Sequence, residues 1–275
     1  MDESRVLARL RRTTTHPAAR GLTDDVAQLG DLIITHDSIA EGIHYLPDDP
    51  PASVGWKLMA VNLSDLAAKG AEPIGALLSL TLRGDDDWEM GFIDGVEAAA
   101  ETYGMPLIGG DTIALPEGAP RVLGLTAIGR SAAPAPSRSG ARPGDALWVV
   151  GTLGDSAAGL ALLHRDKHAS GTLVDVYRRP IPLLCAGRAL APFARASMDV
   201  SDGLLLDAER MAKASGCAVT VDLATLPTSD AFAAAQGRDV EALLFAATGG
   251  DDYALLIALP PELDPFTLSL PSGRG

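Results

Sequence analysis

The stretch SVGWKLMAVNLSDLAAKG, residues 53–70, is apolar on most sides of the helix that its composition predicts. A helix that is apolar nearly all round is buried, so we expect this segment to lie largely inside the protein. It nevertheless carries Asp65 among Val61, Leu63 and Leu66. A carboxylate in such surroundings is costly unless it is paired with a cation or bound to a metal. The segment therefore predicts a buried helix with a polar site beside it.

Predicted strands and helices alternate on both sides of this helix. A helix is expected over 88–103, where Trp88, Phe92 and Val96 share one face at a period of about 3.6 residues. A segment rich in Pro, Ser, Ala and Gly, 131–144, is the best candidate for a linker. The remaining expected elements are strands at 31–37 and 73–82, in PLIGG and RVLGLTAIG, from DALWVVGTLG, near 196–200 and 217–222 and at 253–259, with helices near 155–166, 203–214 and 240–247 and a short amphipathic helix at the start.

These elements predict an α/β (α+β) protein of two domains, residues 1–138 and 139–275. The composition, 47% hydrophobic and 21% charged, is that of a soluble globular protein. No apolar run approaches the ~18 residues that cross a bilayer, and the start does not fit a signal peptide, so we expect a cytoplasmic protein without a membrane partner. The two cysteines, Cys185 and Cys217, fit a reducing compartment and form no zinc cluster.

The formal net charge is −14, from 36 acidic and 22 basic residues. Such a surface repels nucleic acid, and no basic stripe offsets it. It would also repel a polyanionic small substrate, unless cations accompanied that substrate.

Several motifs of familiar catalytic sites are absent or incomplete. There is no G-x-x-x-x-G-K-[ST], which excludes a P-loop, and no G-x-G-x-x-G follows a predicted strand. His164 and His168 have the spacing of zinc ligands, but Arg165 stands where a metalloprotease needs its Glu. The segment GDSAAG misses the second glycine of a serine-hydrolase turn at Ala158. We expect a strand-to-helix turn there, with Ser156 in the first helical turn, and a serine hydrolase as the alternative.

A series of aspartates beside Gly, Ser or Thr remains at the ends of predicted elements. Asp37 ends an apolar strand and Asp65 lies inside an apolar helix, with few arginines or lysines nearby to pair with them. Hard oxygen ligands without His or Cys clusters favour Mg²⁺ or Ca²⁺. Several Mg²⁺ ions would also let an acidic protein hold a polyphosphate. The series consists of Thr23-Asp24-Asp25, Thr35-His36-Asp37, Asn62-Leu63-Ser64-Asp65, Gly109-Gly110-Asp111-Thr112 and Asp199-Val200-Ser201-Asp202-Gly203.

Each aspartate taken singly has a structural alternative. Asp202 or Ser201 could cap the helix that follows them. Asp65 could pair with Lys69 at i+4. Asp111 could shape a turn.

The order of the motifs resembles that of the thiamine-monophosphate kinase family. The segments that carry the resemblance are TDDVA, THDSIAEGIHY, WKLMAVNLSDLAAKGAEP, LIGGDT, RSGARPGD, GTLGDSAAGL, DVSDGL and TGGDDYALL. The resemblance implies the two-domain fold of aminoimidazole ribonucleotide synthetase, HypE and selenophosphate synthetase, with mixed sheets covered by helices. It also implies ATP and several Mg²⁺ ions at aspartate-lined sites, and a homodimer formed by the N-terminal domain.

The residues that match the family's functional positions fall into four overlapping sets. The resemblance implies that Mg²⁺ is bound by Asp25, Thr35, His36, Asp37, Asp65, Asp111, Asp199 and Asp202. It implies contacts to the nucleotide from Tyr103, Gly110, Asp111, Arg138 and Ser201, and contacts to thiamine phosphate from His44 and Asp251. The catalytic residues would be Asp25, Asp37, Asp202 and Arg138.

Three features depart from the family pattern. His36 stands where the family has Ser or Thr, so a metal contact there would come from the backbone or through water. Asp251 stands where the family has Glu, one methylene longer. The family continues into an aromatic-containing tail that helps enclose the substrate, whereas this sequence stops at LSLPSGRG, so we expect a C-terminal domain that is short or truncated at its end.

The implied reaction is direct transfer of phosphate from ATP to thiamine monophosphate, giving thiamine diphosphate and ADP. The acceptor phosphate, with a second pKa of about 6, is already ionised near neutral pH and needs no general base. One alternative is another ATP-dependent synthetase of the same superfamily, and a second is a non-catalytic nucleotide-binding relative. Selenophosphate synthetase would need a reactive cysteine near the N-terminus, and HypE would need one at the C-terminus.

Overall fold

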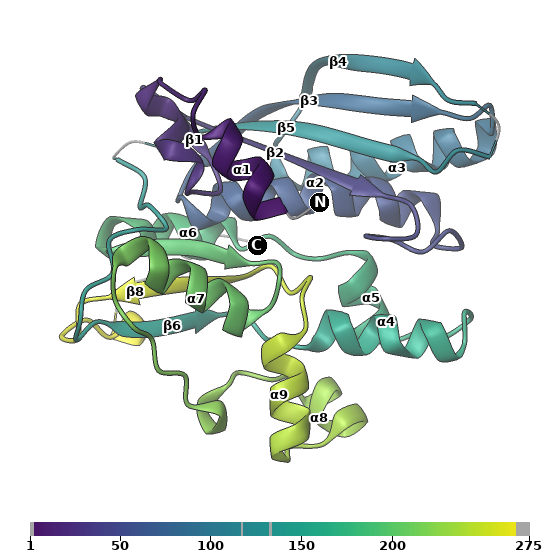
Figure 1. Ribbon diagram of the computed structural model, residues 1–275. Coiled ribbons are helices and arrows are strands. Elements are labelled where there is room, and N and C mark those ends of the chain that lie inside the picture. The colour runs from purple at the N-terminus through teal and green to yellow at the C-terminus, as the bar shows by residue number, and fades with distance from the viewer. Residues whose placement is uncertain (1–2, 117, 132–133, 268–275) are drawn as a thin grey trace.

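Helix α2, Pro51–Ala68, lies between two layered halves of the chain (Figure 1). The computed structural model describes residues 3–116, 118–131 and 134–267. Residues 53 to 68 of α2 are all buried, including the polar side chains of Lys57, Asn62 and Asp65. One side of α2 packs on β2, β5 and α3, and the other packs on α6, β7 and β8. Burial from both sides explains why its sequence lacks a solvent face.

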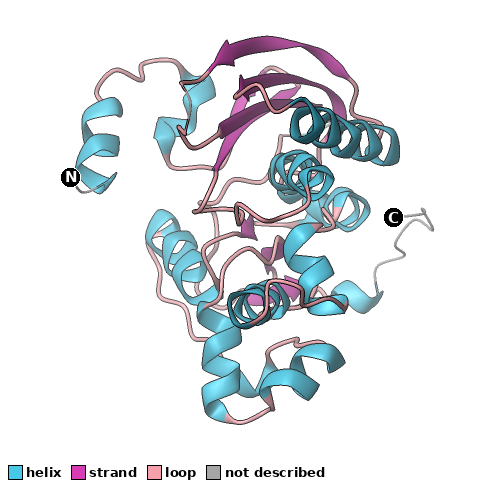
Figure 2. Ribbon diagram, turned by 90° about the vertical axis from the view of Figure 1, so that its right-hand side faces the viewer, coloured by secondary structure: helices cyan, strands magenta, loops and turns pink. Residues whose placement is uncertain are grey.

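The N-terminal half is a twisted sheet with α2 and α3 on one face (Figures 1 and 2). Within the described residues its strands run in the order β1-β2-β5-β3-β4. Only the β3–β4 pair is parallel, and helix α3 connects those two strands. The elements of this half are α1 (Glu3–Leu10), the 3₁₀ segment η1 (Pro17–Leu22), β1 (Ala27–Leu29), β2 (Leu32–Ala40), β3 (Glu72–Leu82), α3 (Asp86–Tyr103), β4 (Leu107–Ala114) and β5 (Val122–Arg130).

The C-terminal half is a smaller antiparallel sheet of order β6-β8-β7 within the described residues, surrounded by helices (Figure 2). Every residue of β7 and β8 is buried. The elements of this half are β6 (Ala146–Val150), α4 (Asp155–Arg165), α5 (Thr172–Arg178), α6 (Leu184–Leu190), η2 (Ala191–Phe193), β7 (Ala196–Val200), α7 (Leu204–Ser215), η3 (Leu223–Thr225), α8 (Asp230–Gln236), α9 (Val240–Thr248), β8 (Ala254–Leu259) and η4 (Pro265–Thr267).

Most of the expected elements are confirmed, and one is wrong. The other predicted helices and strands are found within a few residues of their expected bounds, and Ser156 does lie in the first turn of α4. The sequence did not predict β1, α5, α6 or α8. The predicted strand at 217–222 is absent from the described sheets. This segment lines a cavity beside β6 and pairs with no strand there, and an extended apolar segment becomes a strand only when a partner completes its ladder.

The connection between the halves runs from β5 to β6, through the segment expected to be a linker. Residues 132 and 133 of that segment, and the C-terminal residues 268–275, lie outside the described residues. The boundary between residues 138 and 139 therefore stays a prediction. In the part of the chain that the structure describes, no helix combines the length and apolar character needed to span a bilayer.

Two glycines allow α2 and α3 to pack with their backbones in contact. A Cβ on Gly55 would lie 2.1 Å from the carbonyl oxygen of Phe92, and one on Gly95 would lie 2.0 Å from that of Ala52. These distances are far below a van der Waals contact, so a methyl group at either position would push the helices apart.

We expect Gly95→Ala to lower the free energy of unfolding by about 1–3 kcal/mol, because overpacking outweighs the better helix propensity of alanine. Gly91→Ala, on the same helix, is the matched control, since its Cβ would approach only the ring carbons of Pro51 at 3.2 Å. Urea unfolding of the two variants and the parent measures both effects. Equal stability of the two variants would contradict this account of the α2–α3 contact.

Candidate functional site

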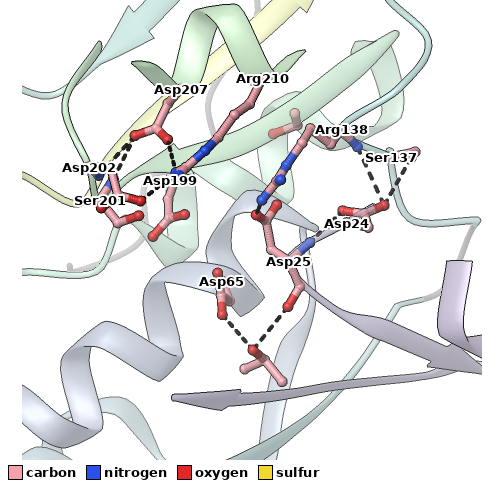
Figure 3. A network of polar contacts seen from close by, with 12 residues as sticks. Asp24, Asp25, Asp65, Ser137, Arg138, Asp199, Ser201, Asp202, Asp207 and Arg210 are labelled. Carbon is pink, nitrogen blue, oxygen red and sulfur yellow. Dashed lines mark hydrogen bonds and ion pairs between the residues drawn. The ribbon is translucent and has the colours of Figure 1, made fainter. Parts of the chain in front are cut away.

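Three carboxylates from separate parts of the chain converge between the two halves (Figure 3). Asp25 follows η1, Asp65 lies on α2, and Asp199 lies on β7 of the other half. Each offers one carboxylate oxygen, and the three oxygens lie within 4.8 Å of one another. We call Asp25, Asp37, Asp65 and Asp199 the aspartate group, because Asp37 on β2 interacts electrostatically with the other three.

Hydroxyl and amide groups hold these carboxylates in place. Thr35 Oγ1 donates to Asp65 Oδ2 and lies 3.3 Å from the carbonyl oxygen of Asp25. Ser64 Oγ donates to Asp199 Oδ2 at 2.7 Å. The side chain of Asn62 also bonds to the backbone of β2, where its Oδ1 accepts the N–H of Asp37 at 2.9 Å. One turn of α2, through Asn62 and Ser64, therefore orients acidic residues of both halves.

The electrostatics of the aspartate group favour a bound cation. Burial, together with the charges of Asp199, Asp37 and Asp25, raises the pKa of Asp65 well above its usual value. Burial, reinforced by Asp25, raises the pKa of Asp199 to about 8, and burial followed by Asp25 raises that of Asp37. Among the described residues no lysine or arginine forms an ion pair with any of these three carboxylates. Convergent hard oxygens without nitrogen or sulfur ligands fit Mg²⁺ or Ca²⁺.

The carboxylates of Asp24 and Asp25 differ from those of Asp37, Asp65 and Asp199, because basic side chains surround them. Lys69 Nζ lies 2.7 Å from Asp24 Oδ1 and 2.8 Å from Asp25 Oδ2. Arg20 pairs with Asp24 at 2.6 Å, and Arg138 pairs with the second oxygen of Asp25. Burial alone would raise the pKa of Asp24, but Lys69 and Arg20 outweigh it and lower that pKa to about 2. Lys69 and Arg138 likewise overcome burial and lower the pKa of Asp25.

The pairing of Asp65 with Lys69, considered from the sequence, is thereby wrong. Lys69 contacts Asp24 and Asp25 and forms no ion pair with Asp65 in the described residues, so the expected i, i+4 pair is not made. Arg138 is held against Asp25 and does not extend from the linker into solvent. The expectation that few basic residues pair with Asp37 and Asp65 holds among the described residues, whereas Asp25 is paired with both Lys69 and Arg138.

Asp202 and Ser201 lie at the edge of this site, at the start of α7 (Figure 3). Neither caps the helix, because the N-cap is Gly203. Asp207 in the first turn instead accepts the backbone N–H groups of Ser201 at 3.1 Å and Asp202 at 3.0 Å. The exposed carboxylate of Asp202 pairs with Arg210.

The two residues expected on the substrate side, His44 and Asp251, meet at a buried lysine. Lys57 Nζ donates to the carbonyl oxygen of His44 at 3.0 Å and pairs with the carboxylate of Asp251. Tyr253 Oη donates to the other oxygen of Asp251 at 2.6 Å. His44 Nδ1 accepts the N–H of Ala40 at 3.0 Å, which leaves Nε2 to carry the proton of the neutral ring.

Other expected residues lie elsewhere in this chain. The ring of His36 points away from buried Thr35, on the opposite face of β2, and bonds to Thr126 at 2.9 Å. Tyr103 packs edge-on against Trp56, with ring centroids 5.5 Å apart. The remaining two, Gly110 and Asp111, lie on exposed β4 at the far edge of the first sheet.

Gly110 has a structural requirement of its own. Its φ is +153°, and a Cβ there would lie 2.0 Å from the carbonyl oxygen of Leu78 on β3. The expected roles of Gly110 and Asp111 with nucleotide and metal stay predictions, and the turn considered for Asp111 is wrong because the residue lies within a strand.

Comparison with known proteins identifies the family. Residues 23–131 match the model of the AIR synthase related protein, N-terminal domain, and residues 142–273 match that of the C-terminal domain. The thiamine-monophosphate kinase of Salmonella typhimurium is 42% identical over 266 residues, which cover 92% of this chain and 80% of that protein. The chain belongs to the thiamine-monophosphate kinase family.

Solved structures of the same family share the fold. The crystal structure of thiamine monophosphate kinase from Aquifex aeolicus is 32% identical, with a TM-score of 0.85, and the match covers 96% of this chain and 90% of that one. The structure of AaThiL complexed with AMPPCP and TMP is also 32% identical, with a TM-score of 0.87 over 96% of this chain and 87% of that one. The expected two-domain fold of the family is therefore confirmed.

Sequence reasoning missed the two lysines that organise this family member's site. Lys57 and Lys69 are both fully buried, although each stands in an apolar helical segment where a lone charge is costly. The cost of a lone charge in an apolar helix predicts a buried partner for each lysine, as it does for Asp65. Their partners, Asp251 and Asp24 with Asp25, are distant in sequence and could not be assigned from spacing.

The raised pKa of Asp199 predicts how metal-free protein responds to pH. The group binds its proton up to about pH 8 when folded, compared with 3.8 when unfolded, so it stabilises the fold at low pH and loses that contribution as pH rises through 8. We expect the free energy of unfolding in EDTA to fall between about pH 5 and pH 8.5. Mg²⁺ should restore it most at the upper end, because metal ligands must be deprotonated. Urea unfolding at both pH values, with EDTA or MgCl₂, measures this.

Asp199→Asn is the control, and it should lose most of the Mg²⁺-dependent recovery. Asp252, whose pKa burial raises to about 8, contributes to the pH dependence in the same direction outside the aspartate group. A Mg²⁺ effect that is equal at both pH values would contradict the assignment.

Proposed function

We propose that this protein phosphorylates thiamine monophosphate with ATP, giving thiamine diphosphate and ADP. The observation that carries the proposal is the convergence of Asp25, Asp65 and Asp199 in a member of the thiamine-monophosphate kinase family. The related AaThiL structure holds AMPPCP and TMP together, which supports the pairing of a nucleotide with this acceptor. The protein is thus a phosphotransferase whose acceptor is a phosphate group.

Several Mg²⁺ ions are the proposed cofactors. Asp37, Asp65 and Asp199 would hold them, with Asp25 sharing its oxygens with the basic side chains already bound to it. When bound, Mg²⁺ neutralises charge on the phosphates and on these buried carboxylates. Thr35 and Ser64 keep the carboxylates oriented, so that little reorganisation accompanies binding.

The chain's own cation for the transferred phosphate is Arg138. Its guanidinium is fixed by Asp25 beside the aspartate group (Figure 3). Its buried Nε–H has no hydrogen-bond partner in the part of the chain that the structure describes, so one donor is available to a phosphate oxygen. A fixed guanidinium positions a phosphate group and offsets charge in the transition state. Ser201 and Asp202, just before α7, are the proposed nucleotide and metal contacts from the second half.

On the acceptor side, Asp251 and His44 are the proposed contacts to thiamine monophosphate. Lys57 and Tyr253 fix the Asp251 carboxylate, so the shorter side chain is held by two buried partners. The acceptor phosphate is already ionised near neutral pH, and the proposed transfer is therefore direct and in line, without a general base.

A homodimer formed through the N-terminal half is also proposed. All eight residues of edge strand β4 are exposed, among them the apolar Leu107, Ile108 and Ile113. An exposed apolar edge strand is normally covered in the native assembly. Gly110 and Asp111 lie on this strand, so in the proposed dimer they would bind nucleotide and metal next to the subunit interface. The cytoplasmic location expected from the sequence stays a prediction.

An assay of ADP release tests the function. We expect release that requires both thiamine monophosphate and Mg²⁺, and a loss in kcat on the order of 10²-fold or more for Asp37→Asn, which removes a charge from the aspartate group. Asp31→Asn is the matched control, because within the described part of the chain that exposed carboxylate forms its one ion pair with Arg130 on the surface.

Other outcomes of this assay identify the alternatives. ADP release without thiamine monophosphate, or with a different acceptor only, would indicate another ATP-dependent synthetase. Stabilisation by Mg-ATP in a thermal-shift experiment with no turnover at all would indicate a nucleotide-binding relative.

Direct transfer predicts that no phosphorylated protein accumulates. Incubation with ATP labelled at the γ-phosphate, followed by denaturation, should leave the protein unlabelled while labelled thiamine diphosphate forms. Stable label on the protein that is passed to thiamine monophosphate in a chase would show a covalent intermediate instead.

A further inference from the structure

Among the described residues, Lys69 is the only lysine that forms an ion pair with a member of the aspartate group, Asp25, and its ammonium also donates to Asp24 and to the carbonyl oxygen of Ser197. Its side chain is fully buried at the C-terminal end of α2. Nζ lies 2.7 Å from Asp24 Oδ1, 2.8 Å from Asp25 Oδ2 and 2.7 Å from the carbonyl oxygen of Ser197. An ammonium has three N–H donors, so these oxygens satisfy it completely, as ligands satisfy a bound cation.

The charges around this ammonium divide the site into two parts. Asp24 and Asp25 form ion pairs with Arg20, Lys69 and Arg138, so cationic side chains neutralise them. In the other part, Asp37, Asp65 and Asp199 form no ion pair with a lysine or arginine of the described residues. Asp25 borders both parts, because one of its oxygens also lies within 4.8 Å of oxygens from Asp65 and Asp199.

We propose that the Lys69 ammonium is a built-in cation of this site, occupying a position beside Asp24 and Asp25 that a divalent ion would otherwise take. It holds Asp25 toward Asp65 and Asp199 before any metal binds. It also lowers by one the number of Mg²⁺ ions that the site accepts. Lys69 is thus a positioning residue that acts through Asp25. The inference rests on the proposed Mg²⁺ site but not on thiamine monophosphate as the acceptor.

The position of Lys69 between the two halves supports this role. Asp24 and Asp25 belong to the N-terminal half, whereas Ser197 lies on β7 of the other half, next but one to Asp199. The ammonium therefore binds oxygens of both halves at the place where the aspartate group is assembled. A buried charge with three oxygen partners is removed only at a large cost, unless another cation replaces it.

Lys69→Met tests the proposal, with calorimetric titration of MgCl₂ and thermal unfolding as readouts. In EDTA we expect the melting temperature to fall by roughly 10 °C, because two buried carboxylates lose their shared partner. Millimolar MgCl₂ should recover at least half of that loss, and the titration should show one more Mg²⁺ bound per chain than in the parent.

Lys57→Met is the matched control. Lys57 is also buried on α2 and also pairs with a carboxylate, that of Asp251, which lies outside the aspartate group. Loss of Lys57 should also lower the melting temperature. The rise in melting temperature on adding MgCl₂ should then be no larger than the rise seen in the parent, and the number of Mg²⁺ ions bound per chain should not change.

Lys69→Gln serves as the second variant if Lys69→Met does not fold in EDTA, since glutamine keeps an N–H donor without the charge. Recovery of either variant as folded protein only when MgCl₂ is present supports the proposal. An unchanged number of Mg²⁺ ions, or misfolding of both variants with and without MgCl₂, overturns it. If the parent itself binds no Mg²⁺, the proposed metal site fails, which is distinct from failure of the role of Lys69.

Discussion

The cost of burying charge between two packed halves governs this structure. Helix α2 is covered on one side by the first sheet and on the other by the second half of the chain, so its polar side chains have no access to bulk water. An isolated carboxylate or ammonium in that position would destabilise the fold strongly. The two buried lysines of this segment, Lys57 and Lys69, are therefore matched by carboxylates from other elements, whereas Asp65 receives a hydroxyl donor from Thr35 and lies among other carboxylates.

The partners of α2 come from both ends of the chain. Lys57 meets Asp251 near the C-terminal strand, Asp65 meets Asp25 and Asp199, and Lys69 meets Asp24 and Asp25. The contacts of Lys57, Asp65 and Lys69 thus join the two halves and form the site. Stability and function thus depend on the same residues. The site cannot form in either half alone, because Asp25 and Asp65 belong to one half and Asp199 to the other.

The two parts of the acidic site have different chemical capacities. Asp24 and Asp25 are neutralised by side chains, and their low pKa values reflect it. The side chains that donate to Asp65 and Asp199 in the described residues are the hydroxyls of Thr35 and Ser64, and the pKa values of both carboxylates are raised. A divalent cation is attracted to the second part, while the first supplies the guanidinium of Arg138 at a fixed position beside it.

The amino-acid sequence by itself determined the buried character of α2, most helices and strands, the family and the acidic residues, because periodicity and ordered motifs are local properties of the chain. Only the tertiary structure decided which aspartates meet. It placed Asp25, Asp65 and Asp199 together, turned the ring of His36 to the other face of β2 and left Asp111 on an exposed edge strand. It also left residues 217–222 without a partner strand, and it gave Lys69 two partners more than forty positions away in place of its helical neighbour. The reason is physical: the free energy of a buried charge depends on the groups that packing brings within a few ångströms, and those groups are set by the fold of the whole chain.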